Sequence, residues 1–477
     1  MILSISTSLE VFFQSRVSQE LTFYLAAAVL LALTAESCIR LLHRDSFGIT
    51  VGVYVTVFAW YFADPFIHPE QYDYLPPSSL GQSYGQVVLF LIGFRVFVPV
   101  AIRWIVSRSS SGVFDMRLTP EQILRVVAAL WLVLFIIGIA RMGGDVRGAV
   151  FPLDGRFGPT MWGRGATESS ASGFLISFAG YLFNAVTAFL GVLIFFQRSL
   201  TWRLLAGAMF AITLPYFFFA GARSHFLAAV MPFILTYLFY GRHLLILKLA
   251  ILAIAFFCLN EGFKFVKVFR LHGFREVLAS ENPFELLGED ERQTGLNMIE
   301  ELCFVNLYLE SGGTSPAYGS RYLNELLNFI PRAIWPSKPL IGIDYAKWRG
   351  FDSQDTDLGV NTTVSSGMIG GGVLNFGKIF GPVASALLMA LWTGLLVRWW
   401  EQRQSLLRLV LFMLGVGLTF NLGRDITLLV LWPVIFAYCF VRLAEICAKP
   451  RIRQLPEPTV AVPGAGAMQV IGGELSQ

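Results

Sequence analysis

Long apolar runs recur along this 477-residue chain, and they constrain its fold more than any other feature. An apolar run of about 17 to 24 residues crosses a bilayer as a helix, because in a helix every backbone polar group finds a partner inside the same segment. The sequence predicts eleven transmembrane helices, the tenth of them short. The predicted spans are residues 21–39, 48–67, 84–106, 122–140, 173–196, 204–220, 226–240, 244–260, 379–397, 409–421 and 426–444.

The composition supports an all-α polytopic membrane protein whose first partner is the lipid bilayer. Hydrophobic residues make up 55% of the chain, charged residues only 14%, and the mean hydropathy is +0.62. Soluble domains are about a quarter charged, so this chain has too few polar residues to cover a globule of its size. A soluble enzyme, a disordered regulator and a secreted disulfide scaffold are excluded. The chain has no basic patch, so nucleic acid is not predicted as a partner. No cofactor or metal is predicted either, because the histidines and cysteines lack metal-ligand spacing.

Basic residues occupy every second connection between the spans, which is the pattern of cytoplasmic loops. The C-terminus is therefore predicted to be cytoplasmic and the N-terminus to face outward, without a cleavable signal peptide. The predicted organisation is eight spans in residues 1–260, a large periplasmic loop in 261–377, three spans in 378–446 and a disordered cytoplasmic tail in 447–477. A loop of this length on an otherwise tight bundle is usually functional.

The large outer loop is expected to contain structure of its own. In residues 292–311 the apolar side chains fall at helical spacing, and residues 320–330 repeat that pattern. We predict two or three amphipathic helices that lie on the outer membrane surface or cap a cavity.

Cationic residues on the outer face are the strongest chemical signal. A charged side chain at the edge of a membrane costs several kcal/mol unless it finds a partner. The arginine fork also pairs with phosphate and stays charged at any relevant pH. Arg223, Arg332, Lys338 and Arg424 would therefore suit a lipid-linked phosphate or diphosphate. Two structural alternatives stay open: Arg223 reaching to lipid headgroups, and Arg424 pairing with Asp425.

Other ionisable residues have similar alternatives. Arg141 lies at the outer end of the fourth span, and His225 is either an interfacial histidine or a base. Arg95 and Arg125 lie inside spans, either as buried ion pairs or as part of a phosphate path.

Two segments of the outer loop have marked patterns. In 328–339, three prolines fix a rigid path that carries Arg332, Trp335 and Lys338. Residues 361–381 are rich in glycine and carry Asn375 just before the next span. The glycines predict either close backbone approach to a ligand or a broken helix that enters the membrane.

With these motifs the chain resembles the Wzy-type oligosaccharide repeat-unit polymerases, which make O-antigen and exopolysaccharide. The resemblance rests on Pro-Arg-x-x-Trp-Pro-x-Lys-Pro at 331–339, Asn-Phe-Gly at 375–377 with Gly381, and the Gly-x-Arg-Ser turn at 221–224. It implies a membrane glycosyltransferase of the broad GT-C type in the bacterial inner membrane, with an active site that faces the periplasm. The implied substrates are undecaprenyl-diphosphate-linked oligosaccharides, and the implied partners are a polysaccharide chain-length regulator and a flippase.

The resemblance also assigns roles. Arg332 and Lys338 match the proline-framed cations, Arg223 matches the arginine of the short turn, and Asn375 matches the glycine-rich entry. Together with Trp335 and Arg141, Lys338 and Asn375 are expected to bind substrate, whereas Arg424 is included on topology alone. Candidates for a general base are His225, Asp344, Asp357 and Asp425, and the sequence does not choose between them.

Three other functions remain open from the sequence. An O-antigen ligase has a similar number of spans and also attacks a lipid diphosphate. A lipid-linked oligosaccharide transporter would place its charges at mid-membrane and show repeat symmetry. A scaffold of an export complex would have no catalytic centre.

Overall fold

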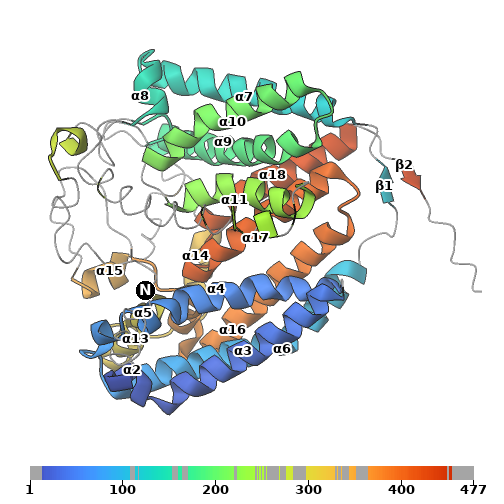
Figure 1. Cartoon of the computed structure of the whole chain (residues 1–477). Coiled ribbons are helices and arrows are strands. Elements are labelled where there is room, and N and C mark those ends of the chain that lie inside the picture. Colours follow the sequence, from blue (N-terminus) through green and yellow to red (C-terminus); the bar gives the residue numbers. More distant parts are fainter. Residues whose placement is uncertain are drawn as a thin grey trace, which may run out of the picture.

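The described residues of the computed structural model form helices and one pair of short strands (Figure 1). They are residues 13–43, 45–107, 113–115, 118–152, 160–163, 170–219, 223–241, 244, 246–248, 250–251, 254, 268, 276–282, 297–327, 330, 335, 343–350, 364–447 and 451–453. The first elements are α2 (Arg16–Gln19), α3 (Leu21–Leu42), η1 (Ser46–Thr50), α4 (Val51–Tyr61), α5 (Ala63–Ile67), η2 (Pro69–Tyr72), α6 (Pro77–Ser107), β1 (Val113–Asp115), α7 (Pro120–Arg141) and α8 (Val146–Val150). After them come α9 (Ser170–Phe196), α10 (Leu200–Phe219), α11 (Arg223–Tyr240), α13 (Met298–Glu310), α14 (Ser320–Leu326), α15 (Ile343–Trp348), α16 (Met368–Glu401), α17 (Leu406–Arg424), α18 (Leu428–Cys447) and β2 (Arg451–Arg453).

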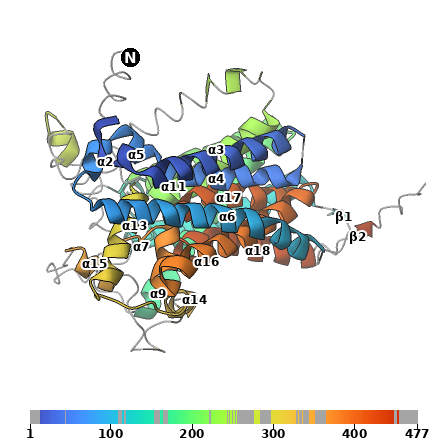
Figure 2. The same cartoon turned by 90° about the horizontal axis from the view of Figure 1, so that it is seen from below.

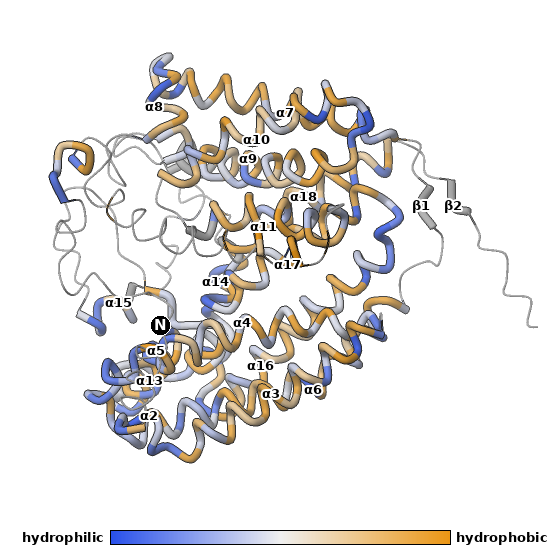
Figure 3. Tube along the Cα trace, viewed as in Figure 1, coloured by the Kyte–Doolittle hydropathy of each residue, from blue (hydrophilic) through white to orange (hydrophobic). Residues whose placement is uncertain are grey.

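The long helices have the length and composition of membrane spans. Among the described residues, eight helices are long and apolar enough to cross a membrane, and two shorter apolar helices cover Ser46–Tyr61 and His225–Tyr240. Apolar residues follow the middle of the helices and hydrophilic ones gather near their ends (Figure 3). Each predicted span is covered by a helix except 244–260, most of which lies outside the described residues. The chain is a multi-pass, all-helical membrane protein.

The helices form two groups joined by α17. In the α6 group, α3 and α16 pack along α6 and α13 covers one end of it, while α4 packs on α3. In the α9 group, α7, α10, α11 and α18 surround α9. Helix α17 contacts α4 and α16 of the first group and α11 and α18 of the second (Figure 1). It is the most buried of the candidate spans, with 83% of its apolar window inside the protein.

The two ends of the bundle differ in what they carry. At one end, which we call the loop end, lie α8, α13 and α15 (Figures 1 and 2). At the other, the tail end, β1 from the α6–α7 connection pairs antiparallel with β2, which follows α18. Arg398, at the end of α16, and Arg403, between α16 and α17, lie at the tail end. From the alternation of basic connections we predict that the loop end faces outward and the tail end faces the cytoplasm.

Helix α16 is a hairpin of two helical segments. Its backbone leaves the helical region at Gly377, where φ is 78° and ψ is −178°, a conformation that favours glycine. The Ser385 hydroxyl donates to the Met368 carbonyl at 2.9 Å, so the short segment 368–376 runs back alongside the long segment. A Cβ at Gly372 would lie 2.2 Å from the Gly381 carbonyl oxygen, so this close crossing needs glycine. Of the two readings of the glycine-rich segment, the broken helix is the one observed.

The helices of the large loop pack onto the bundle instead of lying apart from it. Helix α13 falls within the predicted segment 292–311, and α14 within 320–330. Asn306 of α13 is fully buried and forms amide hydrogen bonds with Gln86 of α6 at 2.9 and 3.0 Å. Because these bonds satisfy both amides in an apolar setting, they fix α13 against the first turns of α6.

Candidate functional site

The candidate site lies at the loop end, where α17 ends at Arg424 and Asp425 begins the turn to α18. Helix α17 comes close to α4 here, because a Cβ at Gly423 would lie 2.1 Å from Thr56 and 2.5 Å from Trp60. The Trp60 indole N–H also donates to the Phe420 carbonyl at 2.7 Å. These contacts hold the end of α17 next to the end of α4.

Asp425 has an unusual environment for a surface turn. It is partly buried, and burial raises the pKa of its carboxyl to about 7, although the Arg424 charge and hydrogen bonds from the Ser365 hydroxyl and the Ile426 N–H act in the opposite direction. A carboxyl with a pKa near neutrality exchanges a proton most efficiently at cellular pH. Perturbed values of this kind are typical of functional sites.

Three oxygen atoms from different elements meet over Gly371 in the short segment of α16. A Cβ built there would lie 3.6 Å from the Tyr322 hydroxyl, 3.7 Å from the Ser366 hydroxyl and 3.8 Å from Asp425 Oδ1. The Tyr322 hydroxyl is buried next to the Ser385 hydroxyl. Burial raises the pKa of Tyr322, so its phenol stays neutral. The bare glycine backbone thus leaves room beside a carboxyl and two hydroxyls.

The start of the short segment is fixed from α4. The Ile369 N–H donates to the hydroxyl of Tyr61, which is fully buried, at 3.0 Å. Gly367, with φ of 84°, precedes this helix start, and a Cβ there would lie 3.1 Å from the Tyr61 hydroxyl. The first N–H groups of a helix attract negative charge, which makes this end favourable for an anion beside Asp425.

Arg424 and Arg223 belong to the same end of the molecule. Arg424 is exposed on the last turn of α17, next to Asp425, and Arg223 begins α11. A Cβ at Gly417 would lie 2.8 Å from Met231 Cβ, and each of the two arginines is about two helical turns from that contact. The Arg223 side chain lies outside the described part of the structure, as do Arg332, Lys338 and Asp357.

The other predicted substrate ligands have different surroundings. Asn375 is buried in the α16 hairpin, where its amide donates to the Gly371 carbonyl at 2.8 Å. The Arg141 guanidinium donates to the carbonyls of Met161 and Gly163, which keeps it against its own connection. Trp335 is partly buried, and its neighbours in the chain lie outside the described residues.

The structure distinguishes the described candidates for a base. The His225 ring packs edge-on against Tyr181 at 5.4 Å. Asp344 is exposed and pairs with Arg321. Asp425 is the one of these three that combines a cation in the next position with a pKa near neutrality.

The interior arginines are not part of this site. Arg95 makes a two-pronged ion pair with Glu36, at 2.9 and 3.0 Å, and Arg125 lies over the Trp202 ring at 5.3 Å. Both pairs lie towards the tail end of their helices. Arg95 therefore forms an ion pair, but a partly exposed one, since its side chain is 35% exposed and that of Glu36 is 31% exposed.

Tyr61, Tyr322 and Ser365 are site residues that sequence reasoning missed. Tyr61 lies within an apolar run, and Tyr322 fits the apolar face of a helix, so each has the pattern of a packing residue. The available signal was the glycine-rich segment itself, since a broken helix needs polar partners for its free end.

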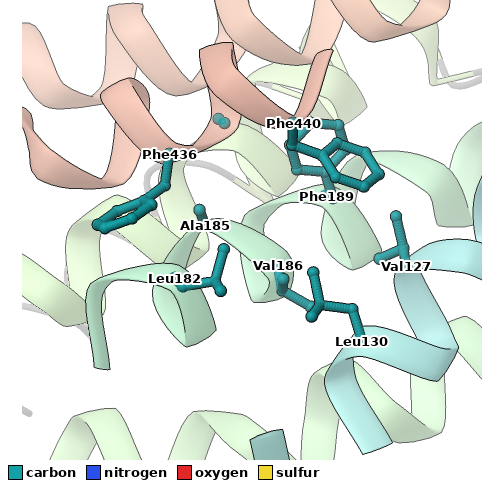
Figure 4. Close-up of a pocket in the computed structure, with 9 residues that line it drawn as sticks. Val127, Leu130, Leu182, Ala185, Val186, Phe189, Phe436 and Phe440 are labelled. Atoms are coloured by element: carbon teal, nitrogen blue, oxygen red, sulfur yellow. The ribbon is translucent and has the colours of Figure 1, made fainter. Parts of the chain in front are cut away.

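No metal site accompanies these groups in the described part of the chain, where no cluster of three or more His, Cys, Asp or Glu residues is found. A pocket between α7, α9 and α18 is lined by apolar residues alone (Figure 4). Its lining includes Val127, Leu182, Phe189 and Phe440, none of which supplies acid–base chemistry. The polar cluster at Asp425 is therefore the better candidate site.

Comparisons of the chain with protein families, with curated proteins and with solved structures found no match. The class that helix length and hydropathy establish is that of a multi-pass, all-helical membrane protein.

Proposed function

We propose that the protein is a membrane glycosyltransferase that polymerises lipid-diphosphate-linked oligosaccharide repeat units at the outer face of the bacterial inner membrane. The observation that carries the proposal is the position of the exposed Arg424 directly before the partly buried Asp425 at the loop end. A glycosyl transfer from a diphosphate needs a cation for the leaving group and a base for the acceptor hydroxyl. The sequence motifs of the loop provide the second line of support.

The proposed reaction is a single displacement at the anomeric carbon of the growing chain. The acceptor hydroxyl oxygen of the incoming unit forms the new glycosidic bond and gives its proton to the Asp425 carboxylate. The bond between the anomeric carbon and the diphosphate oxygen breaks, and its electron pair leaves with the lipid diphosphate. Arg424 stabilises the charge that develops there, together with Arg223 and Arg332. Lys338 and Trp335 would hold the oligosaccharide, whereas the buried Asn375 would keep the α16 hairpin closed.

The broken helix gives a transporter of lipid-linked oligosaccharides some weight as a second candidate. Transporters commonly bind anions at half-helix N-termini near the bilayer midplane. In this chain the short segment begins beside Ser385, about 10 Å along the long segment from Lys378. The helix start is therefore closer to the middle of the long segment than to its loop end, so this geometry keeps the transporter as the second candidate.

The test is a gel of the surface glycan and of the lipid-linked glycan from cells that lack the gene. Loss of polymer with single repeat units still present on the surface supports the polymerase. Full-length polymer stranded on the lipid carrier would indicate the ligase, and units trapped in the inner leaflet would indicate the transporter. An unchanged pattern would refute all three.

Complementation with variants tests the site itself. Asp425→Asn should restore little polymer, because loss of a general base typically costs about a hundredfold to ten-thousandfold in rate. Asp344→Asn is the matched control, since Asp344 is a loop aspartate that is exposed and paired with Arg321. Equal polymer from the two variants would exclude Asp425 as the base.

A further inference from the structure

Aromatic side chains of α13 and α15 gather on the exposed side of the loop end. The ring centroid of Trp348 lies 4.8 Å from that of Tyr308 and 6.4 Å from those of Tyr345 and Phe304. The rings of Tyr345 and Trp348 are nearly parallel, at 18°. Four rings thus pack between two short helices that are far apart in the sequence.

The cluster presents one ordered indole to solvent. Tyr308 and Tyr345 are 5% and 1% exposed, whereas Trp348 is 37% exposed. Tyr74 continues the surface, since its ring lies 6.2 Å from Phe304 and it is 58% exposed. A ligand that binds here meets rings already fixed by their neighbours, so little side-chain entropy is lost. The Arg349 guanidinium lies 3.4 Å from the Phe304 ring centroid and covers it, so the exposed rings are Trp348 and Tyr74, which we call the aromatic surface.

The charges around the aromatic surface are already paired. Buried Glu301 accepts from the Tyr345 hydroxyl at 2.6 Å and pairs with Arg349 at 3.1 Å. Arg321 pairs with Asp344, and the Tyr74 hydroxyl donates to Glu300. Because both arginines already have carboxylate partners, the surface is poorly suited to a phosphate. An acyl chain on this surface would remove water from the carboxylates of Glu300 and Asp344, so the surface is equally poorly suited to acyl chains.

A neutral ligand with both C–H faces and hydroxyl groups matches what remains. The C–H bonds of a pyranose face carry slight positive charge and pack on the negative face of an aromatic ring. Its hydroxyl groups find an acceptor in Glu300 at the edge of the surface. The ligand class that combines these features is a carbohydrate chain.

The aromatic surface also lies next to the candidate site. The opposite side of α13 packs on the start of the short α16 segment, where a Cβ at Gly367 would lie 3.6 Å from Met298 Cβ. A Cβ at Gly370 would lie 3.4 Å from Val305. A single helix therefore separates the exposed rings from the polar cluster around Asp425.

We propose that the aromatic surface binds the glycan, with a sugar ring against Trp348, and holds the chain at the loop end. The identity of that glycan as the polymer rests on the proposed function, whereas the binding of carbohydrate does not.

The test uses the full chain in lipid nanodiscs, titrated with short oligosaccharides cut by mild acid from the surface glycan of the host cell. Trp348→Ala should weaken binding about tenfold, and Trp348→Phe should retain part of it because a ring remains. Trp104→Ala is the control, since Trp104 is 50% exposed on α6 towards the tail end and should not contribute. Equal affinity of Trp348→Ala and the unaltered chain would overturn the proposal.

Two further readouts separate the possible failures. Asp425→Asn should bind the oligosaccharides as well as the unaltered chain does, even where it makes no polymer. If gene loss leaves the surface glycan unchanged while binding still depends on Trp348, the polymerase proposal fails and this one stands. The tryptophan fluorescence that is lost in Trp348→Phe reports on the indole of Trp348. If lipids with brominated acyl chains quench that fluorescence, the indole lies in the bilayer and the carbohydrate assignment is wrong.

Discussion

Asp425 carries the most specific prediction at the scale of a single residue. As a general base it acts when deprotonated, so the transfer rate should rise with pH through about 7. In Asp425→Asn the residual rate should lose this dependence. The measurement is the pH profile of polymer formation from lipid-linked units in nanodiscs, with Asp344→Asn as the control. A profile that Asp425→Asn leaves unshifted would contradict the assignment.

The same carboxyl should affect stability in the opposite sense. Its pKa is raised from 3.8 to about 7 in the folded protein, so over that pH range the folded chain holds a proton that the unfolded chain has released. Stability therefore falls as pH rises through the window, and the full cost is present above it. Asp425→Asn should stabilise the protein by up to about 4 kcal/mol at about pH 8 and by less than about 1 kcal/mol near pH 4. Thermal unfolding of both chains at the two pH values measures the difference.

Arg424 is expected to act on Asp425 as well as on the diphosphate. Its charge lowers the carboxyl pKa, so Arg424→Ala should move the midpoint of the pH profile upward in addition to slowing transfer. Arg424→Lys should restore the midpoint but little of the rate, because a point charge lacks the two-pronged fork. Arg403→Ala, which removes an exposed arginine from the tail end, should change neither. A lower rate with an unmoved midpoint would show that Arg424 does not act on the Asp425 carboxyl.

At the scale of elements, two adjacent glycines in α16 give a matched pair. At Gly371 a Cβ meets its neighbours at 3.6 Å or more, whereas at Gly372 it meets the Gly381 carbonyl oxygen at 2.2 Å. Gly371→Ala should fold normally and lose activity, because its methyl group enters the space between Asp425 and Tyr322. Gly372→Ala should instead lower stability by about 1–3 kcal/mol by forcing the hairpin apart. Thermal unfolding and polymer assays of both variants decide, and an active Gly371→Ala would place the reaction elsewhere.

The elements also show what the sequence can and cannot predict. Long apolar runs predict helices reliably, because a membrane segment has few other ways to satisfy its backbone. The helical spacing in 292–311 likewise predicted α13, but not that Asn306 would be buried against Gln86, more than two hundred residues away. Asp425 was one of four equivalent carboxyl or histidine candidates. What distinguishes it is its place beside Ser365 and α4, and no local pattern encodes that contact. Arg408 has the sequence pattern of a loop cation, yet it is buried in α17 and paired with Glu445.

For the whole molecule, the orientation in the membrane is the prediction to test. The arginine-rich connections predict that the tail end is cytoplasmic and the loop end outside. In a variant without native cysteines, Ser315→Cys at the loop end should react with a membrane-impermeant maleimide added to intact cells. Gln404→Cys, exposed at the tail end, should react only after the membrane is opened. The reverse pattern would put Asp425 on the cytoplasmic side and remove the basis for the proposed reaction.

The strand pair at the tail end has a mechanical consequence. The connection from α6 to α7 is where the chain passes from the α6 group to the α9 group, and β1 within it pairs with β2 after α18. Main-chain hydrogen bonds thus tie this crossing to the last helix, and the buried Arg408–Glu445 ion pair joins α17 to α18 at the same end. A bundle whose two groups are joined at one end opens most at the other end. If the two groups rock against each other, the pivot lies at the tail end and the widest excursion falls at Arg424 and Asp425.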